Sequence, residues 1–502
     1  MKTLNFRVFI PTLIILLVVI ICSVVNKVHF LSATISVKVW VLKQFGPVFT
    51  WSTFFFLLIV CLVYFSKIGR LKIGGDNAVP ELSKWKWFAV TLCTTIATGI
   101  LFWGPAEPLY HYHMPPEGVL LLPQSKPAAH FAISTVLMHW TLTPYGIYTM
   151  AALVFAIGYY NYKQPFNLGT LLYPVFGKYS QGTLGSVVSI ISLIGLVAGM
   201  AASLGAGMLS IKGGIESLFR VKTSTGLLII IGMLIIGTFI FSAASGLKKG
   251  IQKLSSFNAF AFFLLIVFVF VFGPTTHILI QSFEGLKDYV LNFFQRSTMI
   301  WSGIDKDWLN DWTIFYWSNW MAWTPVTALF LGRISKGYTV RQFIHFNLLL
   351  PALFGGIWMM VFSNTAIYFD QLAEGALFEL LQTFGQEQVA FYIFEKLPFS
   401  KILSLFFLVA IFISYVTAAD SNISAMSSIT SYGISPEKPE APLWIKITWG
   451  ILIGAISLLM ITLADVEGIK MISILGGFPA LILLILVAIG LVKLVFKKNE
   501  NN

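Results

Sequence analysis

The stretch KWFAVTLCTTIATGILFWGPAEP, residues 86–108, is apolar toward both ends but polar and small in its centre. The centre runs from Cys93 to Gly99, and Gly104 and two prolines close the stretch. Proline removes a helical hydrogen bond, and unwound backbone is tolerated inside a membrane only where it faces protein or a water-filled cavity. The stretch therefore predicts an interrupted membrane helix beside a cavity, with an ordinary kinked helix as the alternative.

A second apolar stretch has the same character. It reads YWSNWMAWTP at residues 316–325, contains Asn319, ends at Pro325 and is followed by Gly332. Five predicted spans lie between the starts of the two stretches. Transporters built from repeats place their binding sites at matched interrupted helices near the middle of the bilayer. The pair of stretches therefore predicts where a site would lie.

The composition places the whole chain in a membrane. Of 502 residues, 57% are hydrophobic and 11% are charged, whereas a soluble domain carries roughly 25% charged residues. Twelve apolar runs approach the length of about 20 residues that spans a bilayer. These runs lie at about 8–26, 47–66, 86–103, 130–160, 184–211, 225–244, 256–281, 312–332, 343–369, 398–419, 443–463 and 472–496. We predict an all-α polytopic membrane protein with twelve transmembrane helices.

The distribution of charge predicts the orientation. The first run follows the basic segment MKTLNFR but lacks a small-residue cleavage site, so we expect it to be retained. Lys and Arg are more numerous in the terminal segments and even-numbered loops, and acids are more numerous opposite. We therefore expect a multi-pass protein of the plasma (inner) membrane with both termini cytoplasmic. This asymmetry accounts for the net charge of +12 without a nucleic-acid partner.

Two aromatic clusters could converge into a cage. One holds Trp317, Trp320 and Trp323, spaced by threes across a broad helix face; the other holds Trp140, Tyr145 and Tyr148. A quaternary ammonium has no hydrogen to donate, and its diffuse charge is well held by the faces of Trp and Tyr. Such an attraction needs no buried counter-charge. Core packing or an interface belt is the alternative for any single Trp.

Five motifs in order along nearly the whole chain resemble the betaine/choline/carnitine transporter family. They are WGPAEP (103–108), HWTLTPYGIY (139–148), SGLKKGI (245–251), the Trp stretch running into FLGRISKGYTVRQF (330–343), and TAADS (417–421). The resemblance implies a homotrimer with a leucine-transporter-like inverted repeat of five helices. Two N-terminal helices would occupy 1–83, the first repeat 84–283, an amphipathic outer helix and loop 284–311, the second repeat 312–496, and a short cytoplasmic tail 497–502.

The resemblance also implies a substrate site. The family's aromatic box falls on Trp140, Tyr145, Tyr148 and Trp320, with Trp323 guiding substrate along the same helix and Phe330 and Gly99 on the pathway. Tyr145 stands where members often carry Trp. Asn319 stands in place of another Trp, and its amide could bond a substrate carboxylate or hydroxyl, or bond a neighbouring helix instead.

The resemblance further implies a coupling ion. Thr417 matches a sodium-binding hydroxyl, Ser414 could replace a second one that is missing at Ala418, and carbonyls near Cys93 and Ile96 would complete the shell. A second family sodium site is lost at Leu196 and Met200, and Gln252 stands where sodium-independent exchangers carry Arg. We expect sodium-coupled uptake of a betaine-, choline- or carnitine-type compound and no organic cofactor; proton coupling and sodium-independent exchange are the alternatives.

Other polar residues bear on the alternatives. Asp420 is the only acid that we place within a span, as a proton relay or as a helix-to-helix hydrogen bond. His111 and His113 are interpreted as an aqueous loop pair rather than metal ligands. The spans show no His–Glu helical pair, no paired acids and no Gly-flanked Ser, which argues against an intramembrane enzyme. Bulky rings at midspan argue against an open channel. The segment 284–297 has one apolar helical face, suited to the membrane interface or to packing on protein, with lipid as a further partner.

Overall fold

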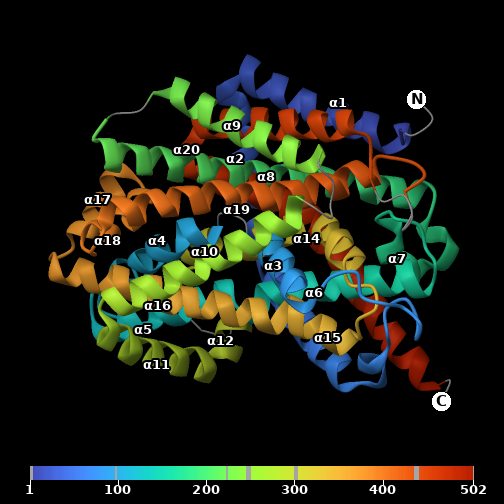
Figure 1. Cartoon of the computed structure of the whole chain (residues 1–502), viewed down its shortest axis with the longest axis horizontal. Coiled ribbons are helices and arrows are strands. Elements are labelled where there is room, and N and C mark those ends of the chain that lie inside the picture. Colours follow the sequence, from blue (N-terminus) through green and yellow to red (C-terminus); the bar gives the residue numbers. More distant parts are fainter. Residues whose placement is uncertain are drawn as a thin grey trace.

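The fold is a bundle of long helices that run along one axis of the molecule (Figure 1). The computed structural model describes residues 4–96, 99–221, 224–244, 250–298, 304–434 and 440–500. Within these ranges the backbone is helical apart from turns and two isolated bridges, Leu4 with Ser431 and Lys72 with Thr339. The all-α fold class is confirmed.

The helices follow one another with few long connections. The first part of the chain contains α1 (Phe6–Val25), α2 (Lys27–Phe65), α3 (Lys84–Ile96), α4 (Gly99–His113), α5 (Lys126–Trp140), α6 (Leu142–Ala156), α7 (Gly169–Phe176), α8 (Thr183–Phe219), α9 (Thr225–Ala244) and α10 (Gly250–Phe272). The second part contains α11 (Thr275–Leu291), α12 (Phe293–Thr298), α13 (Lys306–Leu309), α14 (Phe315–Arg333), α15 (Val340–Ile344), α16 (Leu350–Leu372), α17 (Ala376–Phe384), α18 (Gln388–Glu395), α19 (Ser400–Ile429) and α20 (Leu443–Glu500). Single-turn segments lie at Lys67–Arg70, Ile157–Asn161, Gly177–Ser180, Asn310–Ile314 and His345–Leu349.

Each predicted apolar run falls on helix over its described residues, but fewer than twelve helical segments meet the length and hydropathy of a span. Among the described residues, nine helical segments are long and apolar enough to cross a membrane, and ten if the bent pair α3–α4 is one span. The described apolar part of α9, Gly226–Ser242, is shorter. The protein is therefore a multi-pass membrane protein, while the count of twelve stays a prediction.

Helix α14 is one reason why fewer than twelve helical segments have the hydropathy of a membrane span. It carries the Trp stretch and is not among the apolar spans, yet every one of its residues except Asn319 is buried. It packs against α6, α8, α19 and α20, so protein surrounds it on several sides. A helix that does not face lipid need not be strongly apolar, and its hydroxyl groups find protein partners, as Thr327 Oγ1 does in donating to Asn422 Oδ1 at 2.7 Å. The Trp stretch is thus enclosed by other helices of the bundle.

Two of the predicted spans, the third and the fourth, are interrupted. The predicted interruption of the eighth span is wrong, because α14 runs unbroken from Phe315 to Arg333 with Pro325 inside the helix. Helices α3 and α4 meet at an angle of 55° between Ile96 and Gly99, and α5 gives way to α6 at Thr141, directly after Trp140. A Cβ on Gly99 would lie 2.8 Å from Cη2 of the Trp140 indole. Because Gly99 has no side chain, the Trp140 ring at the α5–α6 break can pack directly onto the backbone of α4.

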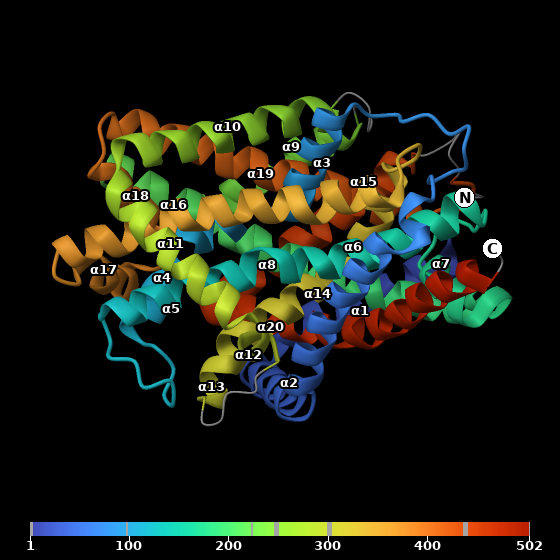
Figure 2. The same cartoon turned by 90° about the horizontal axis from the view of Figure 1, so that it is seen from below.

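The ends of the molecule agree with an even number of crossings. The first turns of α1 and the last turns of α20 lie at one end of the long axis, and α17 and α18 lie at the other (Figures 1 and 2). The amphipathic outer helix is α11, which begins at Thr275, earlier than the predicted 284, because Gly273 and Pro274 end α10. The motif SGLKKGI lies outside the described residues apart from Gly250 and Ile251.

Candidate substrate site

One cavity lies where the interrupted helices meet. Its walls come from α3, α4, α5, α6, α8 and α14. They include seven of the predicted residues, which are Ile96, Gly99, Trp140, Tyr148, Asn319, Trp320 and Trp323. Thr95, Trp103, Ala202, Ser203, Ala206 and Phe315 complete the lining. The third span, which the sequence predicted to be broken, opens this hollow together with the break between α5 and α6, which the sequence did not predict.

Trp320 is the hub of the aromatic cluster. Its ring centroid lies 5.7 Å from that of Trp140, 5.7 Å from that of Tyr145 and 5.3 Å from that of Tyr148. The ring planes are inclined to Trp320 by 76°, 57° and 71° respectively. Rings that stand steeply to one another form adjacent walls rather than a stack. Trp320 therefore contacts the other three residues of the predicted box, although Tyr145 supports Trp320 without lining the cavity itself.

The polar groups of this site are few. The Nε1–H of Trp320 is buried and has no acceptor within the described part of the chain. Asn319 is half-buried, and its Oδ1 accepts a hydrogen bond from Ser473 Oγ at 3.1 Å. Both readings of Asn319 thus find support: it bonds a neighbouring helix, α20, and it also lines the cavity.

Trp323 and Phe330, the other two predicted site residues of α14, differ in whether they reach the cavity. Trp323 lines the cavity, and the position of a Cβ on Gly199 of α8 would fall 2.7 Å from its Nε1, so α8 approaches this ring closely. Phe330 is completely buried at the far end of the helix, where the Arg333 guanidinium lies 6.0 Å from its ring centroid. Phe330 does not reach the cavity, and its place on a pathway stays a prediction.

The four residues of the predicted sodium site lie where α3 ends beside α19. Thr417 donates to Ile413 O and Ser414 O of its own helix, each at 3.0 Å, which leaves its oxygen lone pairs available. Cys93 lies close enough to interact with Thr417. The hydroxyls of Thr94 and Ser421, 2.8 Å apart, join the two helices. Cys93 and Ile96 lie in the last described turn of α3, next to the bend between α3 and α4.

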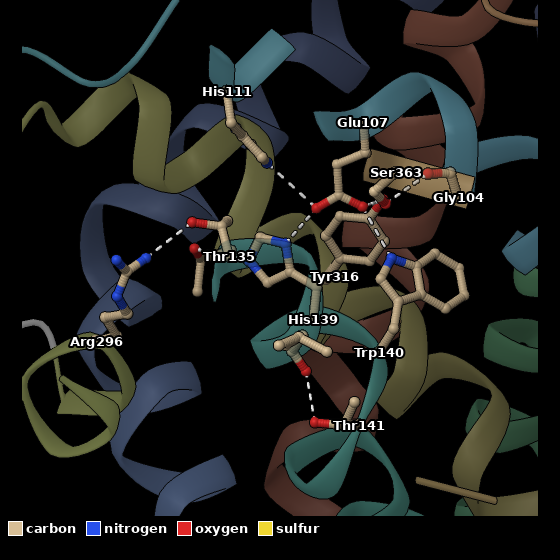
Figure 3. A network of polar contacts seen from close by, with 12 residues as sticks. Gly104, Glu107, His111, Thr135, His139, Trp140, Thr141, Arg296, Tyr316 and Ser363 are labelled. Carbon is tan, nitrogen blue, oxygen red and sulfur yellow. Dashed lines mark hydrogen bonds and ion pairs between the residues drawn. The ribbon is translucent and has the colours of Figure 1, made fainter. Parts of the chain in front are cut away.

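A buried carboxylate behind Trp140 was missed from the sequence. Glu107 of α4 is completely buried, and its Oε2 accepts hydrogen bonds from Trp140 Nε1 at 2.8 Å and from the Tyr316 hydroxyl at 2.6 Å. Its Oε1 lies 2.6 Å from His139 Nδ1 and 3.2 Å from His111 Nε2 (Figure 3). The prolines of WGPAEP favoured a loop there, whereas α4 continues through both prolines to His113.

Three predictions are therefore wrong. Asp420 is not the only acid enclosed within the bundle, because Glu107 is as well. The chain does contain a His–Glu helical pair, Glu107 and His111, four residues apart on α4. His111 and His113 are not an aqueous loop pair, since His111 is completely buried and His113 Nε2 lies 2.6 Å from Asp370 Oδ2. The spacing of Glu107 and His111 was the signal that could have found this cluster.

Asp420 itself joins two helices. Its Oδ2 accepts from Ser242 Oγ of α9 at 2.5 Å, and its Oδ1 lies 3.5 Å from Ser424 Oγ. The residue is almost completely buried. Of the two roles considered from the sequence, the helix-to-helix hydrogen bond is the one that these contacts support.

Comparison with known families agrees with this arrangement. The model of the BCCT family, the betaine/carnitine/choline family transporters, matches residues 7–500. The chain belongs to this family.

Relatives of this BCCT chain are similar along most of its length. A glycine betaine transporter of Acinetobacter baylyi is 28% identical to it, in an alignment that covers 97% of this chain and 73% of the relative. An ectoine/hydroxyectoine transporter of Virgibacillus pantothenticus is 30% identical, and the alignment covers 91% of this chain and 90% of the relative. A high-affinity choline transport protein of Escherichia coli K12 is also 30% identical, and the alignment covers 90% of this chain and 66% of the relative.

A solved structure shows the fold of the BCCT chain. A sodium-coupled sialic acid symporter superposes with a TM-score of 0.51 at 15% identity, covering 88% of this chain and 86% of the symporter. The leucine-transporter-like architecture expected from the sequence is thereby confirmed.

Proposed function

We propose that the protein is a secondary transporter that takes up a quaternary-ammonium compound of the betaine or choline type by alternating access. The observation that carries the proposal is the contact of Trp320 with Trp140, Tyr145 and Tyr148 beside one cavity. Rings at steep angles can surround a trimethylammonium group, and each desolvated cation–π contact contributes about 2 kcal/mol. The names of the relatives, which include glycine betaine and choline transporters, support the same class of substrate.

The polar end of the substrate has its own candidate partners. Trp320 Nε1–H and the Asn319 amide both belong to cavity-lining residues, and both are donors. A betaine carboxylate or a choline hydroxyl offers an acceptor to such donors. This pairing would orient the substrate while the rings hold its cation.

We propose sodium as the coupling ion. Thr417, Ser414 and carbonyls of the last described turn of α3, those of Cys93 and Ile96 among them, would provide the hard oxygen ligands that a small cation prefers. The ion would bridge α3 and α19. Its binding would thus favour one arrangement of the interrupted helix, which is the requirement for coupling ion and substrate through a shared conformational change.

We also propose a homotrimer in a plasma (inner) membrane with cytoplasmic termini. Tyr289 of α11 packs on protein, its hydroxyl 3.1 Å from Thr141 Oγ1 at the α5–α6 break, whereas Leu286, Val290 and Phe294 are exposed. This outward apolar face supports contact with a second copy or with lipid.

Binding by the cage is tested with Trp320→Leu. Removal of the hub ring is expected to weaken binding of glycine betaine and choline by at least about tenfold, because more than one cation–π contact is disturbed. Trp51→Leu is a matched control, since Trp51 is exposed on α2. Unchanged affinity in the Trp320 variant, with both variants folded, would show that Trp320 only packs.

Sodium coupling is tested by uptake into proteoliposomes. An inward sodium gradient is expected to drive accumulation of radiolabelled glycine betaine or choline, and replacement of sodium by potassium is expected to abolish it. Equal uptake in the two media contradicts sodium coupling, and acceleration by an imposed proton gradient or by internal substrate would identify the alternative.

A further inference from the structure

A buried negative charge stands behind one wall of the aromatic cage. Trp140 lines the cavity with its ring, and its Nε1–H donates to Glu107 Oε2 at 2.8 Å. Glu107 is completely buried and contacts α5 through Trp140 and His139 and α14 through Tyr316 (Figure 3). The Trp140 indole therefore lies between the Glu107 carboxylate and the cavity in which a cation would bind.

The partners of Glu107 favour its ionised form. An indole N–H can only donate, so Oε2 acts as an acceptor toward Trp140, and the Tyr316 hydroxyl adds a second donor at 2.6 Å. The other oxygen lies within hydrogen-bonding distance of two imidazoles. His139 Nε2 in turn lies 3.0 Å from Thr313 Oγ1, a hydroxyl that can donate to it, so this ring can be neutral and donate from Nδ1. A carboxylate with donors on both oxygens is the arrangement in which the charged form is well solvated by protein.

We propose that Glu107 is a charge-selecting and positioning residue of the substrate site, acting through the Trp140 indole. By accepting the N–H it fixes the plane of the ring, and it polarises the indole so that the ring face becomes more electron-rich. Its own charge adds a long-range attraction that is weakly screened in a buried site. Both effects favour a cation over a neutral molecule of the same shape. The inference rests on the proposed function.

A purely structural role makes a different prediction. If Glu107 only held α4, α5 and α14 together, its loss would lower stability and weaken charged and neutral ligands alike. Charge selection is visible only in the ratio of the two affinities. The readout is therefore the dissociation constant of 3,3-dimethylbutan-1-ol divided by that of choline. The first compound is the neutral analogue of choline, with a carbon atom in place of the ammonium nitrogen and the same shape.

The decisive experiment measures this ratio by equilibrium binding to the purified full-length protein with and without Glu107→Gln. The ratio is expected to fall about tenfold in the variant, mainly through weaker choline binding. Asp370→Asn is the matched control, because Asp370 is another buried carboxylate paired with a histidine of α4, remote from the cavity lining; it should keep the wild-type ratio. An unchanged ratio in folded Glu107→Gln overturns this inference alone, whereas a wild-type protein that binds neither choline nor glycine betaine overturns the proposed function and this inference with it.

A second comparison applies if Glu107→Gln does not fold. Trp140→Phe keeps a ring in the wall but removes the N–H that joins it to Glu107, whereas Trp320→Phe removes an N–H that has no acceptor in the described part of the chain. The affinity ratio is expected to fall several-fold further in Trp140→Phe than in Trp320→Phe. Equal falls in the two variants overturn the coupling through the indole.

Discussion

Asn319 Oδ1 accepts a hydrogen bond from Ser473 Oγ at 3.1 Å, and this bond fixes the orientation of an amide on the cavity wall. No hydrogen bond from Nδ2 is found within the described part of the chain, so the two N–H groups of this amide remain for a ligand. The bond also ties α14 to α20 beside the site. Ser473 of α20 thus fixes the amide of Asn319 on α14, so the N–H groups of the amide are preorganised for a ligand.

Asn319→Leu is expected to weaken glycine betaine binding by about ten- to hundredfold, because a hydrogen bond to a carboxylate contributes about 1.5–3 kcal/mol. Tetramethylammonium, which has no polar end, should bind the variant and the wild type with similar affinity. The measurement is competition against a radiolabelled ligand at equilibrium. An equal loss of affinity for both compounds would mean that Asn319 shapes the cage and does not bind the polar end of the substrate.

The break between α3 and α4 and the aromatic cluster could be predicted from the sequence because their signals are local. Small and polar residues between Cys93 and Gly99 mark an interruption, and three Trp spaced by threes mark a broad aromatic face. Pro325 gave the same local signal in α14, but that helix is unbroken because protein packs around it. The length of α2 was underestimated, since Lys27–Phe65 is one helix although only residues 47–66 are strongly apolar. Hydropathy reports contact with lipid and therefore says little about helix that extends beyond the lipid.

Apart from the spacing of Glu107 and His111 on one helix, the cluster around Glu107 gives no local signal in the sequence. Glu107, His139 and Tyr316 come from three different helices, and only the fold brings them within hydrogen-bonding distance. Two prolines near Glu107 gave a local loop signal that the packing of α4 against α5 and α16 overrides. Local propensity decides helix ends only where tertiary contacts leave a choice.

Gly99→Ala is expected to lower the affinity for glycine betaine by about tenfold and to destabilise the protein by about 1–3 kcal/mol. A Cβ at this position would lie 2.8 Å from Trp140 Cη2, so the indole must move from the cage wall, and overpacking in a filled core has this range of cost. Gly237→Ala is the control, because a Cβ there meets no heavy atom within 4 Å. That variant should bind normally and be as stable as the wild type or more stable. Normal binding by Gly99→Ala would show that the cage tolerates a displaced Trp140.

Thr417→Ala is expected to raise the sodium concentration for half-maximal uptake by about tenfold, because one of few side-chain oxygens of the proposed ion site is lost. Thr417→Ser keeps the hydroxyl and should restore sodium dependence. Thr365→Ala serves as the control, since Thr365 is also buried and also donates to its own helix, 2.7 Å from Val361 O. The quantity measured is initial uptake across a series of sodium concentrations at fixed ionic strength. An identical sodium response in the Thr417 and Thr365 variants would place the ion elsewhere.

Asp370→Asn is expected to lower stability by about 1–3 kcal/mol without changing ligand selectivity. Asp370 is buried where α16 meets α4, its Oδ2 lies 2.6 Å from His113 Nε2, and its Oδ1 accepts from Phe378 N of α17 at 2.9 Å. An amide can accept only one of these bonds well and turns an N–H₂ group toward the other donor, so a buried polar group loses its partner. Thermal unfolding in detergent measures the change. Glu374→Gln, an exposed acid in the following turn, should unfold at the wild-type temperature, and equal midpoints for the two variants would mean that the His113–Asp370 bond contributes nothing to the α4–α16 contact.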